Sequence, residues 1–311
     1  MFAYVVRRTL YIIPIVFGVA LIVFLLFNVF GGDPARMMLG KNASVKLITE
    51  LRQQLGLDQP LYMQFFEYLK QIVTFDFGRS YSTRQEITEM FKNGLVPSLS
   101  IAGPAFILSL CFSISISLFV SYFRGRWADR LVVVLCIIGM SVPALAFILF
   151  GQFTLAYHWG WFPISGYENV FFERIQYIVL PVIIWITVGL GTDVRFFRTA
   201  ILDEVYQDYV RTARAKGLSE PRIFFKHILK NSLVPIITYT VIQIPFLILG
   251  ALLLENFFGI PGLGSMTIDA INTSDFPVLK AMTTLIAILY VIGNLLTDIF
   301  YKIADPRVTF K

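Results

Sequence analysis

Long apolar stretches without charged residues recur along the chain, and short polar segments separate them. A helix that crosses a bilayer needs about 20 mostly apolar residues, and six stretches have roughly that length. Prolines inside several stretches, such as Pro143 and Pro181, predict kinks, which membrane helices tolerate. The six predicted spans lie near residues 9–30, 97–122, 131–157, 176–192, 233–254 and 279–299.

A longer segment, residues 31–96, separates the first two predicted spans and has helical periodicity of its own. One apolar series stops at Gly56, and a second begins after Pro60 and ends before Gly78. We therefore expect a small helical region here, and a division into residues 1–96 and a five-helix core of residues 97–311. The two series are Leu47, Ile48, Leu51 and Leu55, then Leu61, Phe65, Leu69 and Val73.

Composition and charge strengthen the membrane prediction. The chain is 57% hydrophobic with a mean hydropathy of +0.72, which excludes an ordinary soluble fold. Its net charge is +6, but the basic residues flank the apolar runs, which favours a role in membrane topology over nucleic-acid binding. Most of the 26 lysines and arginines fall on the side that holds both termini. Both termini are therefore predicted to be cytoplasmic, and residues 31–96 extracytoplasmic.

Side chains typical of catalysis or ion coupling are scarce within the predicted spans. Asp193, Glu255 and Asp298 fall at or near span ends, where an interfacial role is the simpler interpretation. His158 and His227 are predicted to lie on opposite sides of the membrane, and no carboxylate accompanies either of them. Neither a metal site nor a catalytic site is therefore indicated. The sequence lacks a phosphate-binding G-x-x-x-x-G-K-[ST] loop as well. An enzyme is therefore disfavoured. The chain also has no energy source of its own, so energy to move a solute across the membrane is expected from a partner.

The polar segment of residues 209–231 differs from the other connections because it is amphipathic. Gly217 and Ser219 separate two helical pieces, with Ser219 as the predicted N-cap and Pro221 in the first turn. Such a helix either lies in the membrane interface or enters a groove of a soluble partner. A helical wheel places Arg222, Lys226 and Lys230 on one arc and Phe224, Phe225, Ile228 and Leu229 on the opposite arc.

This segment resembles the cytoplasmic coupling loop of permease subunits in bacterial ABC importers. "DYVRTARAKGL" followed by "FFKHILKN" is similar to the B-type permease of the dipeptide and oligopeptide family. "RRTLYIIPIVFGV", "GGDPARMMLG", "FFGIPGLG" and "DPRV" follow the order of that family along nearly the whole chain. The resemblance implies a type I importer permease fold with six transmembrane helices in the bacterial inner membrane.

The resemblance also implies functional residues. The coupling loop would span residues 198–232 and contact an ATPase through its apolar arc, while a turn near residue 262 would line the outer gate or meet a binding protein. The ATPase-coupling residues would be Ala213, Ala215, Gly217, Arg222, Phe224, Phe225, Lys226, His227, Ile228, Leu229 and Asn231. The extracytoplasmic residues would be Pro261, Gly262 and Gly264.

The implied machine has several subunits. A second, C-type permease would complete the path, two cytoplasmic ATPases would bind ATP and Mg²⁺, and an extracytoplasmic solute-binding protein would deliver cargo. This chain would lie in the bilayer without a cofactor of its own and without contact to nucleic acid. Di- or oligopeptides are the implied cargo. Nickel, glutathione and sugars remain alternative cargoes, and a secondary transporter, a channel or a membrane scaffold remains an alternative class.

Overall fold

The computed structural model describes residues 2–40, 43–249 and 251–304, and all regular elements within these ranges are helices. The "DPRV" motif at residues 305–308 and the side chain of Asp298 lie outside the described part. The chain forms two compact units, and α5, α11, α12 and α14 contribute residues to both. The first unit comprises residues 1–98, 248–256 and 261–295, and the second comprises residues 99–247, 257–260 and 296–311.

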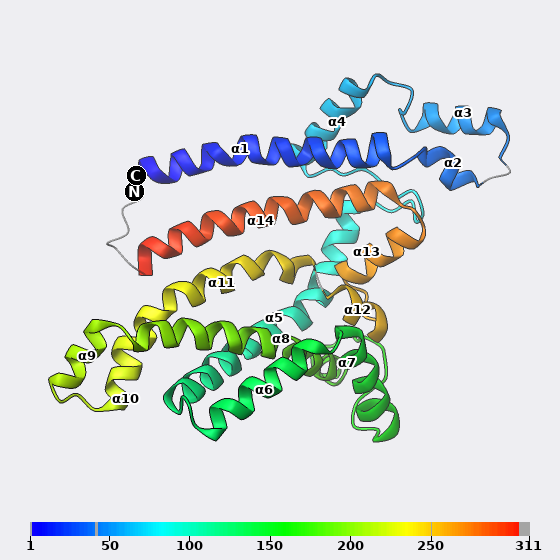
Figure 1. The fold of residues 1–311 in the computed structure, drawn as a ribbon. Coiled ribbons are helices and arrows are strands. Elements are labelled where there is room, and N and C mark those ends of the chain that lie inside the picture. Colours follow the sequence, from blue (N-terminus) through cyan, green and yellow to red (C-terminus); the bar gives the residue numbers. More distant parts are fainter. Residues whose placement is uncertain (1, 41–42, 250, 305–311) are drawn as a thin grey trace. The chain divides into compact units, whose positions relative to one another are not determined.

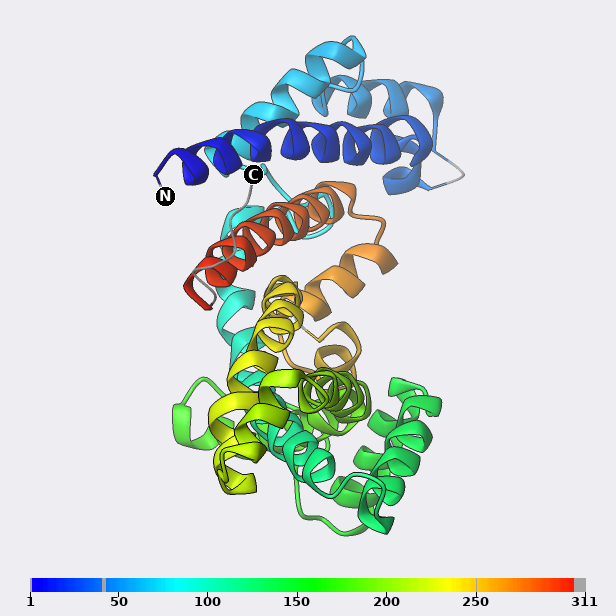
Figure 2. The same cartoon turned by 60° about the vertical axis from the view of Figure 1, so that its left-hand side comes forward.

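In the first unit, α1 and α14 run side by side, and α4 packs along α1 (Figures 1 and 2). Phe24, Tyr68 and Met282 belong to the buried core that joins these helices. The elements are α1 (Phe2–Leu25), a π-helical turn (Leu26–Phe30), α2 (Pro34–Leu39), α3 (Val45–Gln54), α4 (Leu61–Thr74), the start of α5 (Ile87–Tyr122), most of α12 (Leu252–Phe258), α13 (Leu263–Asn272) and most of α14 (Phe276–Ala304).

The two short helices predicted within residues 31–96 are confirmed as α3 and α4. The predicted apolar face of α4 is rotated, however. Val73 is 81% exposed, whereas Tyr68 and Ile72 are buried together with the partly buried Phe65 and Leu69. These four positions share one face of a helix, and Tyr68 contributes because its ring is apolar although its hydroxyl is polar.

In the second unit, α6 and α8 form a close helix pair. Gly191 allows this approach, because a Cβ there would lie 2.9 Å from the carbonyl oxygen of Cys136. The elements are the rest of α5, α6 (Trp127–Ser141), α7 (Ala144–Gly151), a π-helical segment (Gln152–His158), α8 (Phe171–Val205), α9 (Asp208–Ala215), α10 (Glu220–Ile223), a π-helical turn η3 (Phe224–Ile228) and most of α11 (Leu229–Leu249).

Among the described residues, four helical segments are long and apolar enough to cross a membrane: Ile13–Phe30, Ile87–Tyr122, Phe171–Val205 and Phe276–Asn294. A fifth candidate is the pair Trp127–Ser141 and Ala144–His158, which is bent by 93°. The single kinked span predicted over residues 131–157 is therefore broken. Val142 is extended, as expected for a residue that precedes proline. The predicted fifth span, residues 233–254, corresponds to α11, which ends at Leu249, and to the separate α12.

Candidate functional site

The amphipathic segment of residues 198–232 forms a helical hairpin in which α9 and α10 are joined by a tight turn (Figure 1). Gly217 has φ +75°, as its predicted role in the turn requires, because a Cβ would be strained there. Pro221 stands in the first turn of α10. Ser219 is at the N-cap position, but its side chain makes no capping hydrogen bond, and its carbonyl accepts the N–H of Ile223 instead.

The hairpin has an apolar core of its own, which it shares with the end of α8. Side chains from α8, α9, α10 and η3 are buried against one another, and the ring of Phe224 packs edge-on against Tyr122 of α5 at a centroid distance of 5.3 Å. Burial of this many apolar side chains orders a segment that would otherwise be mobile. The buried residues are Ile201, Val205, Val210, Ala213, Ile223, Phe224 and Ile228.

Polar contacts hold the two arms of the hairpin together. Arg214 in α9 makes a bidentate ion pair with Glu220 in α10, with Nε 2.7 Å from Oε1 and Nη2 3.4 Å from Oε2. The hydroxyl of Tyr209 donates to Oε2 of Glu204 at 2.5 Å. Burial, followed by this hydrogen bond to a carboxylate, raises the pKa of Tyr209 to about 12. Tyr209 therefore stays a neutral donor at any physiological pH.

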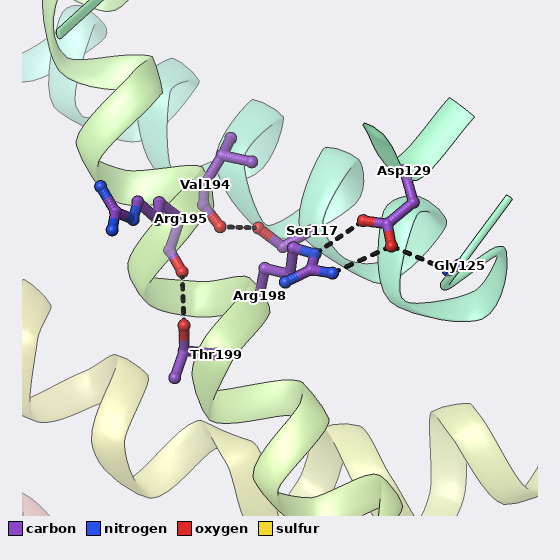
Figure 3. A network of polar contacts seen from close by, with 7 residues as sticks. All are labelled: Ser117, Gly125, Asp129, Val194, Arg195, Arg198 and Thr199. Atoms are coloured by element: carbon purple, nitrogen blue, oxygen red, sulfur yellow. Dashed lines mark hydrogen bonds and ion pairs between the residues drawn. The ribbon is translucent and has the colours of Figure 1, made fainter. Parts of the chain in front are cut away.

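The base of the hairpin is fixed to α6 by a second ion pair (Figure 3). Arg198 in α8 donates from Nε and Nη2 to the two carboxylate oxygens of Asp129, at 2.8 and 2.9 Å. Asp129 also accepts the backbone N–H of Gly125 at 2.8 Å, and the hydroxyl of Ser117 in α5 donates to the carbonyl of Val194 at 3.0 Å. Because a bidentate guanidinium fixes both distance and orientation, this pair holds the end of α8 against α6.

The predicted apolar contact arc is only partly available to a partner. Phe224 is 3% exposed and Ile228 is fully buried, so both belong to the core of this chain and not to a contact surface. Leu229 is partly exposed. Phe225 is 64% exposed and is the one aromatic residue of the arc that is free to contact another subunit.

This difference from the wheel has a local cause. Residues 224–228 form a π-helical turn, which holds one more residue than an α-turn and shifts the register of the side chains that follow. The turn then continues directly into α11, so the second helical piece is not separate from the following helix. Phe225 is exposed because it lies roughly a quarter turn from Phe224, at the edge of the apolar arc, whereas Ile228 lies about one turn after Phe224 and shares its buried face.

The predicted coupling residues consequently divide into three groups by exposure. Ala213, Phe224 and Ile228 are buried, and His227 and Leu229 are partly exposed. The exposed residues are Ala215, Gly217, Arg222, Phe225, Lys226 and Asn231.

The second predicted site, the turn of residues 261–264, lies in the first unit and is mostly buried. Pro261 is exposed, but Gly262 and Gly264 are buried beside the carboxylate of Glu255. A Cβ on Gly262 would lie 2.3 Å from Oε2 of Glu255 and 2.5 Å from Oγ of Ser98. The glycines are therefore required by close packing inside this chain, and Pro261 is the predicted residue left at the surface.

Glu255 is fully buried and caps the first turn of α13 from outside the helix. Its Oε1 accepts Ser98 Oγ at 2.8 Å and the N–H of Ala251 at 3.1 Å. Its Oε2 accepts the N–H groups of Gly264 and Ser265 at 2.7 and 3.2 Å. Burial raises the pKa of this carboxyl, and the four donors oppose that shift.

Sequence reasoning assigned two carboxylates to membrane interfaces, but in the structure Glu255 is fully buried and Asp193 is partly buried and hydrogen-bonded between helices. Glu255 is a cap, and Asp193 lies within α8, hydrogen-bonded to α5 and α11. The signal for Glu255 was the glycine-rich turn that follows it, because exposed backbone N–H groups at a helix start require an acceptor. For Asp193 the signal was its place in a helix that continues for three more turns.

Comparison with known proteins identifies the family. Residues 113–310 match the family described as binding-protein-dependent transport system inner membrane component, and residues 1–102 match the N-terminal family of such membrane components. The chain is 34% identical over its whole length to the glutathione transport system permease protein GsiC of Salmonella typhimurium, and 33% identical to that of Escherichia coli K12, with full coverage of each relative.

The matches span nearly every residue of the chain, and the all-helical fold with several membrane-crossing helices agrees with them. The chain belongs to the binding-protein-dependent family of multi-pass inner-membrane permease subunits of ABC importers.

Proposed function

We propose that this chain is one half of the membrane pathway of an ATP-driven importer, and that the hairpin of residues 198–232 couples it to cytoplasmic ATPases. The other half is a second permease subunit, and a solute-binding protein delivers cargo from outside. The chain crosses the membrane six times, with α11 as the span beyond the five candidates, and both termini are cytoplasmic. ATP and Mg²⁺ are bound, and ATP is hydrolysed, by the ATPase subunits.

One observation carries the coupling assignment: the aromatic Phe225 is exposed on a hairpin whose core is packed within this chain. A packed segment with an exposed aromatic anchor and a basic rim suits transmission of force between subunits, because interface energy concentrates in few buried aromatic residues. Arg222 and Lys226 are exposed nearby and supply the rim. The ion pair between Arg198 and Asp129 then passes the movement to α6 and α8.

The cargo is proposed from the relatives. The proteins that match over the whole length are named as glutathione transport permeases. We therefore propose glutathione, or another short peptide, as the transported solute. Peptides bear an ammonium and a carboxylate group, so the pathway needs groups that replace the water around these charges.

The coupling hairpin is tested by substitution of Phe225 in the complete transporter. Phe225→Asp is expected to release the ATPase subunits during purification and to lower glutathione uptake by at least about tenfold. The physical reason is that burial of an unpaired carboxylate in the subunit contact is costly. Phe225→Leu is the matched control, because it keeps an apolar side chain. This variant should retain the ATPase subunits and most of the glutathione uptake. Normal amounts of the Asp variant in the membrane show that insertion is intact.

Retention of the ATPases and of uptake by the Phe225→Asp transporter would contradict the coupling assignment. Glutathione uptake by this chain reconstituted without ATPases would contradict the importer mechanism as a whole. Phe224→Asp is a poorer test, because Phe224 is buried and its substitution disrupts the hairpin itself.

A further inference from the structure

A partly buried carboxylate lies in the second unit where three helices meet. Asp193 is in α8, about 18 Å before its last residue at 1.5 Å per residue. Its Oδ1 accepts the hydroxyl of Tyr239 in α11 at 2.9 Å, and its Oδ2 accepts the hydroxyl of Ser109 in α5 at 3.1 Å. The three helices are the membrane-crossing elements α5 and α8 and the proposed span α11.

The donors around Asp193 are all side chains. Gln243 in α11 lines the cavity beside the same carboxylate. Hydroxyl and amide groups rotate about single bonds, so each of them can turn away or change partner without movement of the backbone. The carboxylate therefore keeps the capacity to exchange a protein donor for a donor on a ligand.

A small cavity adjoins the carboxylate. It has a volume of about 50 Å³, and Ser109, Asp193, Thr240 and Gln243 contribute its polar lining. Liquid water occupies about 30 Å³ per molecule, so the space holds one group of the size of a water or a primary ammonium, and not a whole peptide. Gly189, one turn before Asp193, also lines it.

The charge of Asp193 has no cationic partner within the part of the chain that the structure describes, since none of the ion pairs found there includes it. Asp129 in the same unit, by contrast, is paired with Arg198. An ionisable side chain inside membrane-crossing helices is costly and normally faces a partner or a transport path.

We propose that Asp193 and its cavity form a subsite for the ammonium group of the cargo, used as the peptide passes through this subunit. The inference rests on the proposed function. In this subsite, the ammonium group donates hydrogen bonds to three acceptors. These are the Asp193 carboxylate and the oxygens of two of the hydroxyl or amide groups around it. The freed hydroxyl protons turn toward other partners, and no covalent bond changes.

Asp193→Asn separates this role from a structural one. The amide Oδ1 still accepts the Tyr239 hydroxyl, and Nδ2–H donates to Ser109 Oγ after that hydroxyl turns around. The variant therefore keeps the contacts and removes the charge. The complete transporter, in vesicles with its binding protein and labelled glutathione, is expected to show a maximal uptake rate at least tenfold lower, with unchanged KM and retained ATP hydrolysis.

Gly189→Ala tests the cavity while the charge stays in place. A Cβ on Gly189 would lie 3.8 Å from both Asp193 Oδ2 and Ser109 Oγ, which is ordinary contact, so the helix accepts it while the cavity becomes smaller. We expect a two- to fivefold lower maximal uptake rate. The matched control is Gly103→Ala in α5, which meets nothing within 4 Å and should leave uptake unchanged.

The outcomes are distinguishable. Uptake by Asp193→Asn at the wild-type rate overturns the subsite and leaves the proposed function standing. Loss of ATP hydrolysis together with uptake assigns Asp193 to the fold or to coupling and also overturns the subsite. If the wild-type transporter moves neither glutathione nor a dipeptide with a free ammonium group, the proposed cargo is wrong, and the inference that rests on it fails too.

Discussion

Two internal carboxylates, one in each compact unit, show how the same functional group serves different ends. Glu255 accepts four hydrogen bonds, three of them from backbone N–H groups, which cannot rotate away. Asp193 accepts its hydrogen bonds from side chains and adjoins a cavity. A carboxylate held by backbone donors is committed to the fold. One held by side chains retains the freedom to bind a ligand.

Glu255→Ala should have the largest effect on stability. It leaves the first-turn N–H groups of α13 and the Ser98 hydroxyl buried without their acceptor, at a cost of about 3 kcal/mol or more. Thermal unfolding of the purified subunit in detergent measures the loss. An unchanged melting temperature would mean that Glu255 is not the cap that the structure shows.

Substitution of a glycine beside each carboxylate should have opposite results. Gly262→Ala places a Cβ 2.3 Å from Glu255 Oε2 and should cost about 1–3 kcal/mol through forced repacking. Gly189→Ala meets only contacts of 3.8 Å and adds a better helix former, so its stability should be equal or higher. The same thermal unfolding assay measures both variants. An equal loss of stability in the two would contradict the proposed difference between the Glu255 and Asp193 sites.

The serine partners give a finer test. Ser98→Ala removes a donor to Glu255 and leaves the N–H of Leu263 without its acceptor, so we expect a loss of about 1–2 kcal/mol. Ser109→Ala removes one donor from a carboxylate that keeps the Tyr239 hydroxyl, and its loss should be below about 1 kcal/mol. The ratio of the two losses is the quantity to compare, because it cancels effects of the detergent.

Asp193→Asn should have the smallest effect on stability, within about 0.5 kcal/mol, because the amide keeps both hydroxyl contacts. The large expected decrease in uptake would then not be explained by a loss of stability. A drop in melting temperature comparable to that of Glu255→Ala would place Asp193 in the same structural class as Glu255.

Periodicity and turn chemistry predicted much of the local structure. The positions of α3, α4 and α9 and the turn at Gly217 all depend on residues close in sequence, so a short window contains the information. The membrane class followed from composition, and the family followed from ordered motifs. Topology, the six-span count and the coupling contacts remain predictions.

Other features depend on distant residues and were not predictable in this way. Ser98 and Glu255 are separated by 157 positions, and Ser109 and Asp193 by 84, so no local pattern relates them. The rotated face of α4 needed the polar hydroxyl of Tyr68 to have a partner, which Thr284 supplies from α14. Pro143 indicated the break at Val142, but no local sequence pattern gives its angle of 93°.

The π-helical turn of residues 224–228 also holds one residue more than an α-helical path would need. Each residue of an α-helix advances the side-chain azimuth by about 100°, and each residue of a wider π-turn advances it by less. The extra residue is therefore absorbed within the turn, and the hairpin keeps nearly the same direction relative to α11. An insertion of one residue elsewhere in α11 would have no such outlet and would rotate the hairpin, with Phe225, by about 100° relative to the rest of that helix.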